Sequence, residues 1–373
     1  MERRSFLRTG LALGAVGLGG GVGVLPDLAM ASGPRSPGTL RLNSNENPLG
    51  LAPAARRAII DNLGEANRYP RDVRVEMVEA LAALHGVEPE NIVLGNGSTE
   101  VLQMSVQALA EPGATLVMPD PTFEDVPWYG EPFSYSLEKV PLDSGYAHDI
   151  GRMRERAEAG SGRALVYICN PNNPTGTLTP SAEIDAWIGS ASADVYFLVD
   201  EAYYEYCTDP GYWSCMKWIA NPNVIVTRTF SKIHGMAGMR LGYAVAHEET
   251  AERLRRYIAA TNANYLVLVA ARASLDDAGL IDRSREANNT GVRILHDVLQ
   301  ELDLEYLPSH TNFVMHRING ELDTYRERML EADVRVGRPF PPMLEYNRVS
   351  IGTPDEMARF AEVLRSFRRN GWI

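Results

Sequence analysis

Short apolar runs that alternate with amphipathic stretches constrain the fold of this chain more than any other feature of its sequence. The apolar runs contain many β-branched residues and are bounded by Gly, Pro, Asn or Asp, which predicts buried strands. They lie at residues 91–94, 115–118, 164–169, 195–199, 224–229 and 241–245. Amphipathic stretches at 99–109, 181–188 and 249–260 predict helices. The alternation predicts an α/β fold in which a mostly parallel sheet is flanked by helices on both faces.

The sequence changes character after about residue 285. A long helical pattern at 289–302 is followed by a strand candidate at 312–316, a helix at 322–331 and strand candidates near Val334 and Val349. This rhythm is typical of a smaller α+β domain. We therefore expect a targeting segment at 1–31, an N-terminal arm at 32–65 that belongs in part to the small domain, a large domain at 66–285 and a small domain at 286–373.

Composition excludes several classes of protein. The 373 residues carry 36 basic and 48 acidic side chains, and the formal net charge of −12 argues against a nucleic-acid-binding surface. The three cysteines are too few and too scattered for a disulfide framework or a zinc cluster, and the seven histidines show no metal-binding spacing. We expect neither a metal ion nor a nucleic-acid partner.

The first 31 residues have the features of a targeting segment. Arg3 and Arg4 precede a weakly apolar, Gly-rich stretch at 9–25, and residues 29–31 (Ala-Met-Ala) fit the small-x-small pattern of signal-peptide cleavage. The pattern resembles a twin-arginine export signal. We expect a periplasmic or extracellular protein without a stable membrane span after processing, because a span needs about 20 apolar residues. A disordered extension or a simple anchor is the alternative.

Polar or glycine-rich segments follow four of the predicted strands, at the edge where open α/β sheets bind their ligands. The first, 95–100 (Gly-Asn-Gly-Ser-Thr-Glu), joins a strand to a helix. Its backbone N–H groups could bind a phosphate, although a turn with a Ser or Thr helix cap is the more common explanation of such a segment alone. The second, 170–176 (Asn-Pro-Asn-Asn-Pro-Thr-Gly), predicts a rigid turn that presents an Asn side chain or is purely structural.

The other two segments carry charged side chains. Asp200 ends a buried strand, where a carboxylate is unfavourable unless it meets a cation or a donor; a helix cap is the alternative. Lys232 follows another strand, beside Ser231 and shortly before Arg240. A buried lysine has a lowered pKa and is nucleophilic enough to form a Schiff base, although a lone lysine is more often a solvated surface charge.

The order and spacing of these four segments resemble those of the fold-type I, class I/II pyridoxal-phosphate aminotransferases, and most closely the histidinol-phosphate aminotransferase branch. The resemblance extends from 40–48 (Leu-Arg-Leu-Asn-Ser-Asn-Glu-Asn-Pro) to 348–353 (Arg-Val-Ser-Ile-Gly-Thr). It implies a large α/β domain with a mostly parallel sheet, a smaller α+β domain, and pyridoxal 5'-phosphate as the cofactor.

The resemblance also implies a role for individual residues. Lys232 would form the Schiff base, and Asp200 would pair with the pyridine nitrogen of the cofactor. Asn173 and Tyr203 would hydrogen-bond the phenolic oxygen and complete the catalytic set. The remaining cofactor contacts would come from Phe123, which stacks on the ring, and from Gly97, Ser98, Thr99, Ser231 and Arg240, which bind the phosphate. Tyr69 would reach the phosphate of the neighbouring subunit in a homodimer with shared active sites. Substrate anions would be bound by Arg348 and Arg338, with Asn45 at the entrance.

The activity implied by the resemblance is the transfer of an amino group from an amino acid or related amine to a 2-oxo acid. The mechanism would be ping-pong, through aldimine and ketimine forms of the cofactor. Thr99 stands where the family usually has Asp, and His234 stands where an aromatic residue often follows the lysine. These two departures argue against a specific role in histidine biosynthesis. The expected export argues against it too, because that pathway is cytoplasmic. An amino-acid oxidase or decarboxylase on the same scaffold is the alternative, and a non-enzymatic cofactor-binding protein is a more remote one.

Overall fold

The computed structural model describes residues 38–109, 112–132, 135–160 and 162–373. Residues 40–373 form one compact unit. The targeting segment expected at 1–31 lies outside the described residues. Among the helices that are described, none combines the length and the apolar character needed to cross a membrane.

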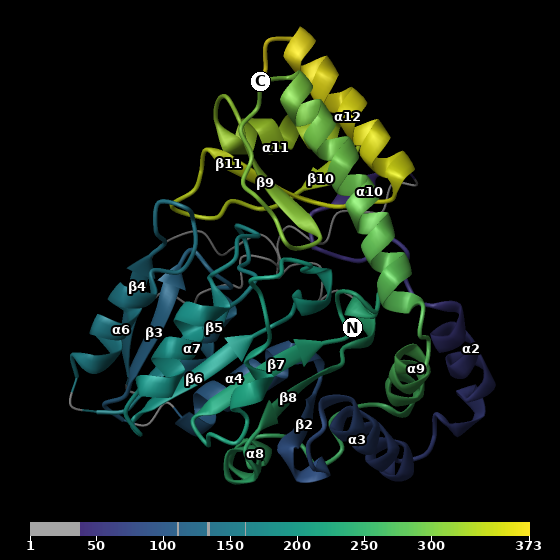
Figure 1. Ribbon diagram of the computed structural model, residues 1–373. Coiled ribbons are helices and arrows are strands. Elements are labelled where there is room, and N and C mark those ends of the chain that lie inside the picture. The colour runs from purple at the N-terminus through teal and green to yellow at the C-terminus, as the bar shows by residue number, and fades with distance from the viewer. Residues whose placement is uncertain (1–37, 110–111, 133–134, 161) are drawn as a thin grey trace, which may run out of the picture. The chain divides into compact units, whose positions relative to one another are not determined.

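A seven-stranded sheet lies in the lower part of this unit as drawn in Figure 1. Its strands are β2 (Ile92–Gly95), β3 (Thr115–Asp120), β4 (Ser136–Pro141), β5 (Ala164–Cys169), β6 (Val195–Asp200), β7 (Val224–Thr229) and β8 (Gly242–Ala246). They lie in the order β2-β8-β7-β6-β5-β3-β4. Strand β8 runs opposite to the other six strands. The predicted α/β class with a mostly parallel sheet is therefore confirmed.

Both faces of the sheet are buried under helices. Along β5, Val166 and Ile168 belong to one apolar cluster, whereas Leu165 and Tyr167 belong to the other, as the twofold alternation of a strand requires. The first cluster is completed by side chains of α2 (Pro53–Asp61), α3 (Arg71–His85), α6 (Ile150–Glu158), α7 (Ser181–Ser190) and α9 (Tyr265–Leu275). The second is completed by α4 (Gly97–Leu109), α5 (Asp125–Gly130) and α8 (Glu248–Arg255).

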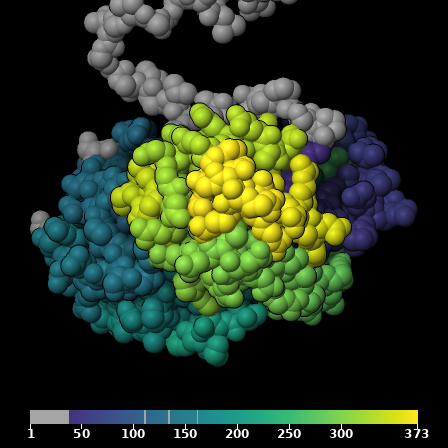
Figure 2. Space-filling view, turned by 90° about the horizontal axis from the view of Figure 1, so that it is seen from above, coloured from purple at the N-terminus to yellow at the C-terminus, as the bar shows by residue number. Residues whose placement is uncertain are grey.

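The C-terminal part has its own core and two small sheets. Its elements are α10 (Leu280–Glu301), β9 (Phe313–Arg317), α11 (Leu322–Glu331), β10 (Val334–Val336), β11 (Tyr346–Ser350) and α12 (Pro354–Arg369). Strand β9 pairs antiparallel with β11, and β10 pairs in parallel with β1 (Leu40–Leu42) from the N-terminal arm. Seen from above, these C-terminal residues form one continuous surface (Figure 2). Short 3-10 helices lie at Leu63–Glu65, Pro89–Asn91, Tyr204–Tyr206, Cys215–Trp218 and Ala237–Met239.

Helix α10 connects the two cores (Figure 1). Leu280 at its start packs in the first cluster of the large sheet, whereas Leu295 and Val298 pack in the C-terminal core. The helix is continuous through residue 285, where the sequence predicted the boundary between two domains. That boundary stays a prediction.

Helix α12 begins at a capping box and buries an apolar stripe. The Thr353 side chain accepts a hydrogen bond from the backbone N–H of Glu356, and the Glu356 carboxylate accepts one from the N–H of Thr353. Four turns of helix follow, and Phe360, Leu364 and Phe367 all lie in the C-terminal core.

We expect Leu364→Ala to lower the free energy of unfolding by about 2–5 kcal/mol, because Leu364 is completely buried and its removal leaves a cavity. Leu330→Ala is the matched control, since 54% of Leu330 is exposed and its truncation should change stability by less than about 0.5 kcal/mol. Urea unfolding of the two variants measures the difference. Equal effects would contradict the assignment of α12 to this core.

Candidate active site

The carboxyl ends of three neighbouring parallel strands bring the predicted site segments together. In the paired register, Cys169 at the end of β5 lies beside Asp200 at the end of β6, and Asp200 lies beside Thr227 of β7. The turn at 170–176 follows β5 directly, and Lys232 follows β7 by three residues. Adjacent parallel strands end at the same edge of a sheet, so segments far apart in sequence share one site.

Asp200 is a buried carboxylate surrounded by donors. Its Oδ2 accepts a hydrogen bond of 3.0 Å from the Tyr167 hydroxyl, and its Oδ1 accepts bonds from the Thr227 hydroxyl at 3.1 Å and the Ala202 N–H at 3.2 Å. Burial raises the pKa of Asp200 to about 6, while these donors and the charge of Lys232 act in the opposite direction. The carboxylate is thus mostly ionised near neutral pH and suited to face a cation.

Lys232 supplies an amine with a lowered pKa. Burial, together with the positive charges of Arg348 and Arg240, lowers the pKa of Lys232 to about 8, although Asp200 and Glu46 act against this shift. Its Nζ lies 3.4 Å from the Asn45 carbonyl oxygen, to which it donates, and 5.6 Å from the centre of the Tyr203 ring. A substantial fraction of the amine is therefore neutral and nucleophilic at mildly alkaline pH.

The chain contains only two other lysines, and both form surface ion pairs. Lys139 lies 3.3 Å from Asp120, and Lys217 pairs with Asp185. Both side chains are about half exposed. Lys232 is therefore the lysine positioned for covalent chemistry at the sheet edge.

The start of α4 and the Arg240 side chain form a cradle for an anion. Gly97, at φ +77°, begins the helix, and a Cβ there would overlap the Arg240 guanidinium. A Cβ at Gly242 of β8 would overlap the N–H of Ser98 in the same helical turn. Arg240 also donates to the Ser231 hydroxyl at 3.3 Å. Backbone donors at a helix start, a guanidinium and a hydroxyl are the groups that bind phosphate.

Asn45 with Tyr203, and Arg348 with Asn173, form two hydrogen-bonded pairs, and the charge of Arg348 acts on Tyr203. The Asn45 Nδ2 donates to the Tyr203 hydroxyl at 3.0 Å, and the Ser350 hydroxyl donates to the Asn45 Oδ1 at 3.1 Å. The Arg348 Nη1 donates to the Asn173 Oδ1 at 2.6 Å, and its Nη2 donates to the Asn43 carbonyl at 3.0 Å. The N-terminal arm, the turn after β5 and strand β11 therefore meet at one place.

Gly337 brings the loop of Arg338 close to the backbone of Arg348. The Gly337 N–H donates to the Arg348 carbonyl at 2.8 Å, and a Cβ at Gly337 would lie 2.5 Å from that oxygen. The Cζ atoms of Arg338 and Arg348 lie 4.2 and 4.6 Å from the centre of the same Phe340 ring. Both guanidinium groups thus make cation–π contacts with one aromatic side chain.

The remaining predicted residues are less tightly connected. Phe123 is half-buried and packs against the apolar cluster on the α4 face, and Thr99 lies in the first turn of α4. Tyr69 is 77% exposed. His234 is buried, hydrogen-bonded to the Ser274 hydroxyl at 2.7 Å and packed against Phe230, and its burial lowers its pKa to about 4.

The structure adds three residues that the sequence analysis did not name. Tyr167 and Thr227 hold the Asp200 carboxylate, and Glu124 forms an ion pair of 2.7 Å with Arg338. Buried strand positions such as Tyr167 give no signal in the sequence that distinguishes a hydrogen-bonding role from packing. The position of Glu124 directly after Phe123 is the one signal that could have identified it.

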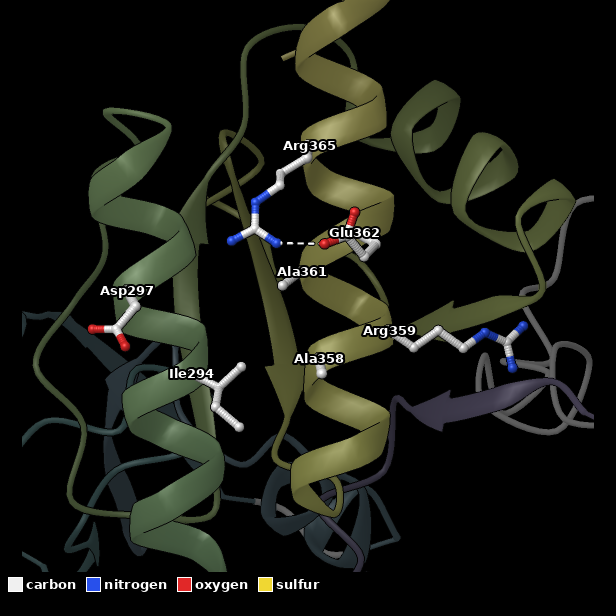
Figure 3. A pocket seen from close by; sticks show the side chains of 7 residues that line it. All are labelled: Ile294, Asp297, Ala358, Arg359, Ala361, Glu362 and Arg365. Atoms are coloured by element: carbon white, nitrogen blue, oxygen red, sulfur yellow. Dashed lines mark hydrogen bonds and ion pairs between the residues drawn. The ribbon is translucent and has the colours of Figure 1, made fainter.

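A separate surface pocket of about 430 Å³ lies between α10 and α12 (Figure 3). It is lined by Ile294, Asp297, Ala358, Arg359, Ala361, Glu362 and Arg365. None of these is a predicted site residue, and Arg365 in it is paired with Glu362 at 2.7 Å. Within the described part of the chain, no group of three or more His, Cys, Asp or Glu side chains is placed to hold a metal ion.

Comparison with known proteins agrees with this geometry. Residues 37–364 match the family model of the class I and II aminotransferases. The chain is 37% identical to histidinol-phosphate aminotransferase 1 of Nitrosococcus oceani, over 88% of this chain and 89% of the relative. Its fold matches a solved structure from Erwinia carotovora atroseptica with a TM-score of 0.88 at 41% identity, over 90% and 97% of the two chains. It also matches the histidinol-phosphate aminotransferase of Sinorhizobium meliloti in complex with pyridoxal-5'-phosphate, with a TM-score of 0.81 at 26% identity over 88% and 91%.

The chain belongs to the class I and II aminotransferase family and has the fold-type I architecture. It is an enzyme, a transaminase that uses pyridoxal 5'-phosphate, so the predicted class, activity and cofactor are confirmed. The residues present fit that cofactor, because the buried Asp200 carboxylate suits its ring nitrogen, the cradle at Gly97 and Arg240 suits its phosphate, and Lys232 suits its aldehyde.

We expect the apoprotein to capture the cofactor at a rate that rises with pH through about 8 and then levels off. The neutral amine is the nucleophile, and the pKa of Lys232 is lowered from 10.5 to about 8. Arg348→Gln should move the midpoint to higher pH, because it removes a positive charge that lowers this pKa. Stopped-flow absorbance of the bound cofactor measures the rate.

Lys232→Ala should abolish the visible absorbance band of the bound cofactor, whereas Lys217→Ala, the matched control, should keep it. A wild-type midpoint near 10.5, or a retained band in Lys232→Ala, would contradict the assignment of Lys232.

Proposed function

We propose that this enzyme transfers the amino group of an amino acid or related amine with an anionic group to a 2-oxo acid, and that histidinol phosphate is the first donor to test. The relatives' names support the donor, since several are histidinol-phosphate aminotransferases at 35–37% identity. The observation that carries the proposal is the pair of guanidinium groups of Arg348 and Arg338 on the Phe340 ring, beside Asn173 and Tyr203. A guanidinium binds a carboxylate or phosphate through two parallel hydrogen bonds.

The individual side chains have distinct tasks in this proposal. When bound, the cofactor supplies an aldehyde that accepts the amino group and a protonated ring that withdraws electrons from the substrate carbon. Lys232, once released from the cofactor, would act as general base and remove the proton from that carbon. It would then act as general acid and return the proton to the carbon of the former aldehyde group. A pKa of about 8 suits both directions of this transfer.

Asp200, Asn173 and Tyr203 position and polarise the ring. The Asp200 carboxylate pairs with the ring nitrogen and keeps it protonated. The Asn173 Oδ1 already accepts from Arg348, so its amide N–H groups are left to donate to the phenolic oxygen. Tyr203 accepts from Asn45, which leaves its own hydroxyl proton for the same oxygen. Phe123 stacks on the ring, and Gly97, Ser98, Thr99, Ser231 and Arg240 bind the phosphate.

The homodimer expected from the resemblance is part of this proposal. Tyr69 is exposed on the protein surface, which suits a side chain that completes the phosphate site of a second copy. Apolar side chains near it are exposed as well; Ile60, Leu63 and Val75 are each more than half exposed. Neighbouring exposed apolar side chains are typical of an interface between subunits.

Export by the twin-arginine pathway to the periplasm or beyond, followed by cleavage after Ala31, is also proposed. Its support is the sequence pattern of Arg3, Arg4 and residues 29–31. A cofactor-containing enzyme is the kind of folded cargo that such a signal would direct.

We expect the wild-type enzyme to convert 2-oxoglutarate or another 2-oxo acid into its amino acid when supplied with histidinol phosphate or an α-amino acid, without oxygen uptake or release of carbon dioxide. A screen of donors and acceptors, with oxygen and carbon dioxide followed in parallel, measures this. Oxygen consumption in step with product would identify an oxidase, and carbon dioxide release would identify a decarboxylase.

Arg348→Ala should raise KM for the donor by about 10- to 100-fold, because a charge-assisted hydrogen bond contributes about 1.5–3 kcal/mol. The cofactor band should stay. Loss of the band, with donor KM unchanged, would place Arg348 with the cofactor instead of the substrate.

Replacing Arg3 and Arg4 together by Lys should keep the full-length chain in the cytoplasm, because the paired arginines are the proposed export signal. Cell fractionation with immunoblotting measures the distribution. Unchanged export in the double variant would contradict the signal, and Arg8→Lys is the matched control outside the pair.

A further inference from the structure

The strongest unassigned feature of the site is the carboxylate of Glu124. Its Oε2 lies 2.7 Å from the Nη2 of Arg338, which comes from a segment 214 residues later in the chain. Glu124 follows Phe123 directly, in the turn between β3 and α5. The ion pair therefore joins the loop of the ring-stacking residue to the loop of the second arginine.

The ion pair between Glu124 and Arg338 is partly buried. The side chains of Arg338 and Glu124 are 27% and 30% exposed, so the two charges are partly shielded from water yet remain accessible to a ligand. Partial burial strengthens the attraction between charges compared with fully exposed pairs. A substrate anion that binds Arg338 must share it with this carboxylate or displace it.

The pair also stands next to the arginine that is proposed to bind the donor. Arg338 and Arg348 contact the same Phe340 ring, at 4.2 and 4.6 Å from its centre. The Arg338 Nη1 donates to the Pro339 carbonyl at 2.9 Å, which fixes the guanidinium toward Glu124. One negative charge is thus paired with Arg338, whose guanidinium contacts the same Phe340 ring as that of Arg348.

We propose that Glu124 is a specificity-determining residue, whose carboxylate offsets the charge of Arg338 and disfavours amino donors whose anionic group binds at Arg338. This inference rests on the proposed function, because it assumes that Arg348 and Arg338 bind the donor. A phosphate or carboxylate at Arg338 meets the repulsion of Glu124 as well as the attraction of Arg338. A neutral group at the same position meets no such repulsion and can donate a hydrogen bond to the Glu124 carboxylate.

Glu124→Gln tests this proposal with little change of structure, because the amide oxygen of Gln can still accept the hydrogen bond from Arg338. Two matched pairs of donors serve as probes. Histidinol phosphate and histidinol differ by one phosphate, and glutamate and glutamine differ by one charge. We expect the ratio of kcat/KM for the anionic member over the neutral member to rise about tenfold, as removal of one nearby like charge predicts.

The change should lie in KM for the anionic donor, with kcat and the neutral donor's KM nearly unchanged. Glu124→Asp, which keeps the charge, should retain a ratio close to wild type. Glu252→Gln is the matched control for lost charge, since Glu252 pairs with Arg256 on α8 in an exposed ion pair. Competitive inhibition by inorganic phosphate gives a second readout and should become stronger only in Glu124→Gln.

Three outcomes would overturn the inference. An unchanged ratio in Glu124→Gln would show that the carboxylate does not influence the choice of donor. An equal loss for both members of a pair, with a lowered unfolding temperature, would show that the ion pair only tethers the two loops. If the wild type transaminates none of the four donors while retaining the cofactor band, the proposed function fails and this inference fails with it.

Discussion

The buried carboxylate of Asp200 is the interaction on which the rest of this structure depends. An ionised group at the end of a buried strand is stable only where donors surround it, and Tyr167, Thr227 and the N–H of Ala202 supply them. Because these donors come from the neighbouring strands β5 and β7 and from the turn after β6, the parallel register of the sheet fixes the carboxylate in place. The pKa of Lys232, three residues beyond β7, is lowered by burial and by the charges of Arg348 and Arg240, although the charge of Asp200 acts against this shift.

On the proposed substrate side, two arginines contact one aromatic ring, and a nearby carboxylate partly neutralises one of them. Gly337 allows the loop before β11 to approach the strand closely, and this places Arg338 and Arg348 on one aromatic ring. Contacts with Asn173 and Asn43 orient Arg348, whereas Glu124 offsets Arg338. The proposed cofactor side therefore contains one carboxylate and one amine, Asp200 and Lys232. On the proposed substrate side, the net positive charge depends on Glu124, so a single substitution can change it.

Much of this arrangement could be predicted from the sequence, because the signals are local. The strands at Ala164–Cys169 and Val224–Thr229 have the predicted bounds, and the four polar segments follow predicted strands, so the sheet-edge rule alone brings them together. Other features depend on contacts between distant segments. Strand β4 (Ser136–Pro141) is a largely exposed edge strand without an apolar run, so its sequence does not stand out. The helix predicted at 249–260 ends at Arg255. The pairing of Glu124 with Arg338 could not be predicted, since ion pairs across 214 residues leave no pattern in a single sequence.

The central claim is that Lys232 at this sheet edge carries the cofactor, and the small number of lysines makes it directly testable. Borohydride reduction of the cofactor-loaded protein, followed by proteolysis and mass spectrometry, identifies the lysine that is covalently modified. The structure predicts that the pyridoxyl group is recovered on Lys232, because Lys139 and Lys217 lie in half-exposed surface ion pairs. Recovery of the modification on either of those two lysines, with Lys232 unmodified, would contradict the account.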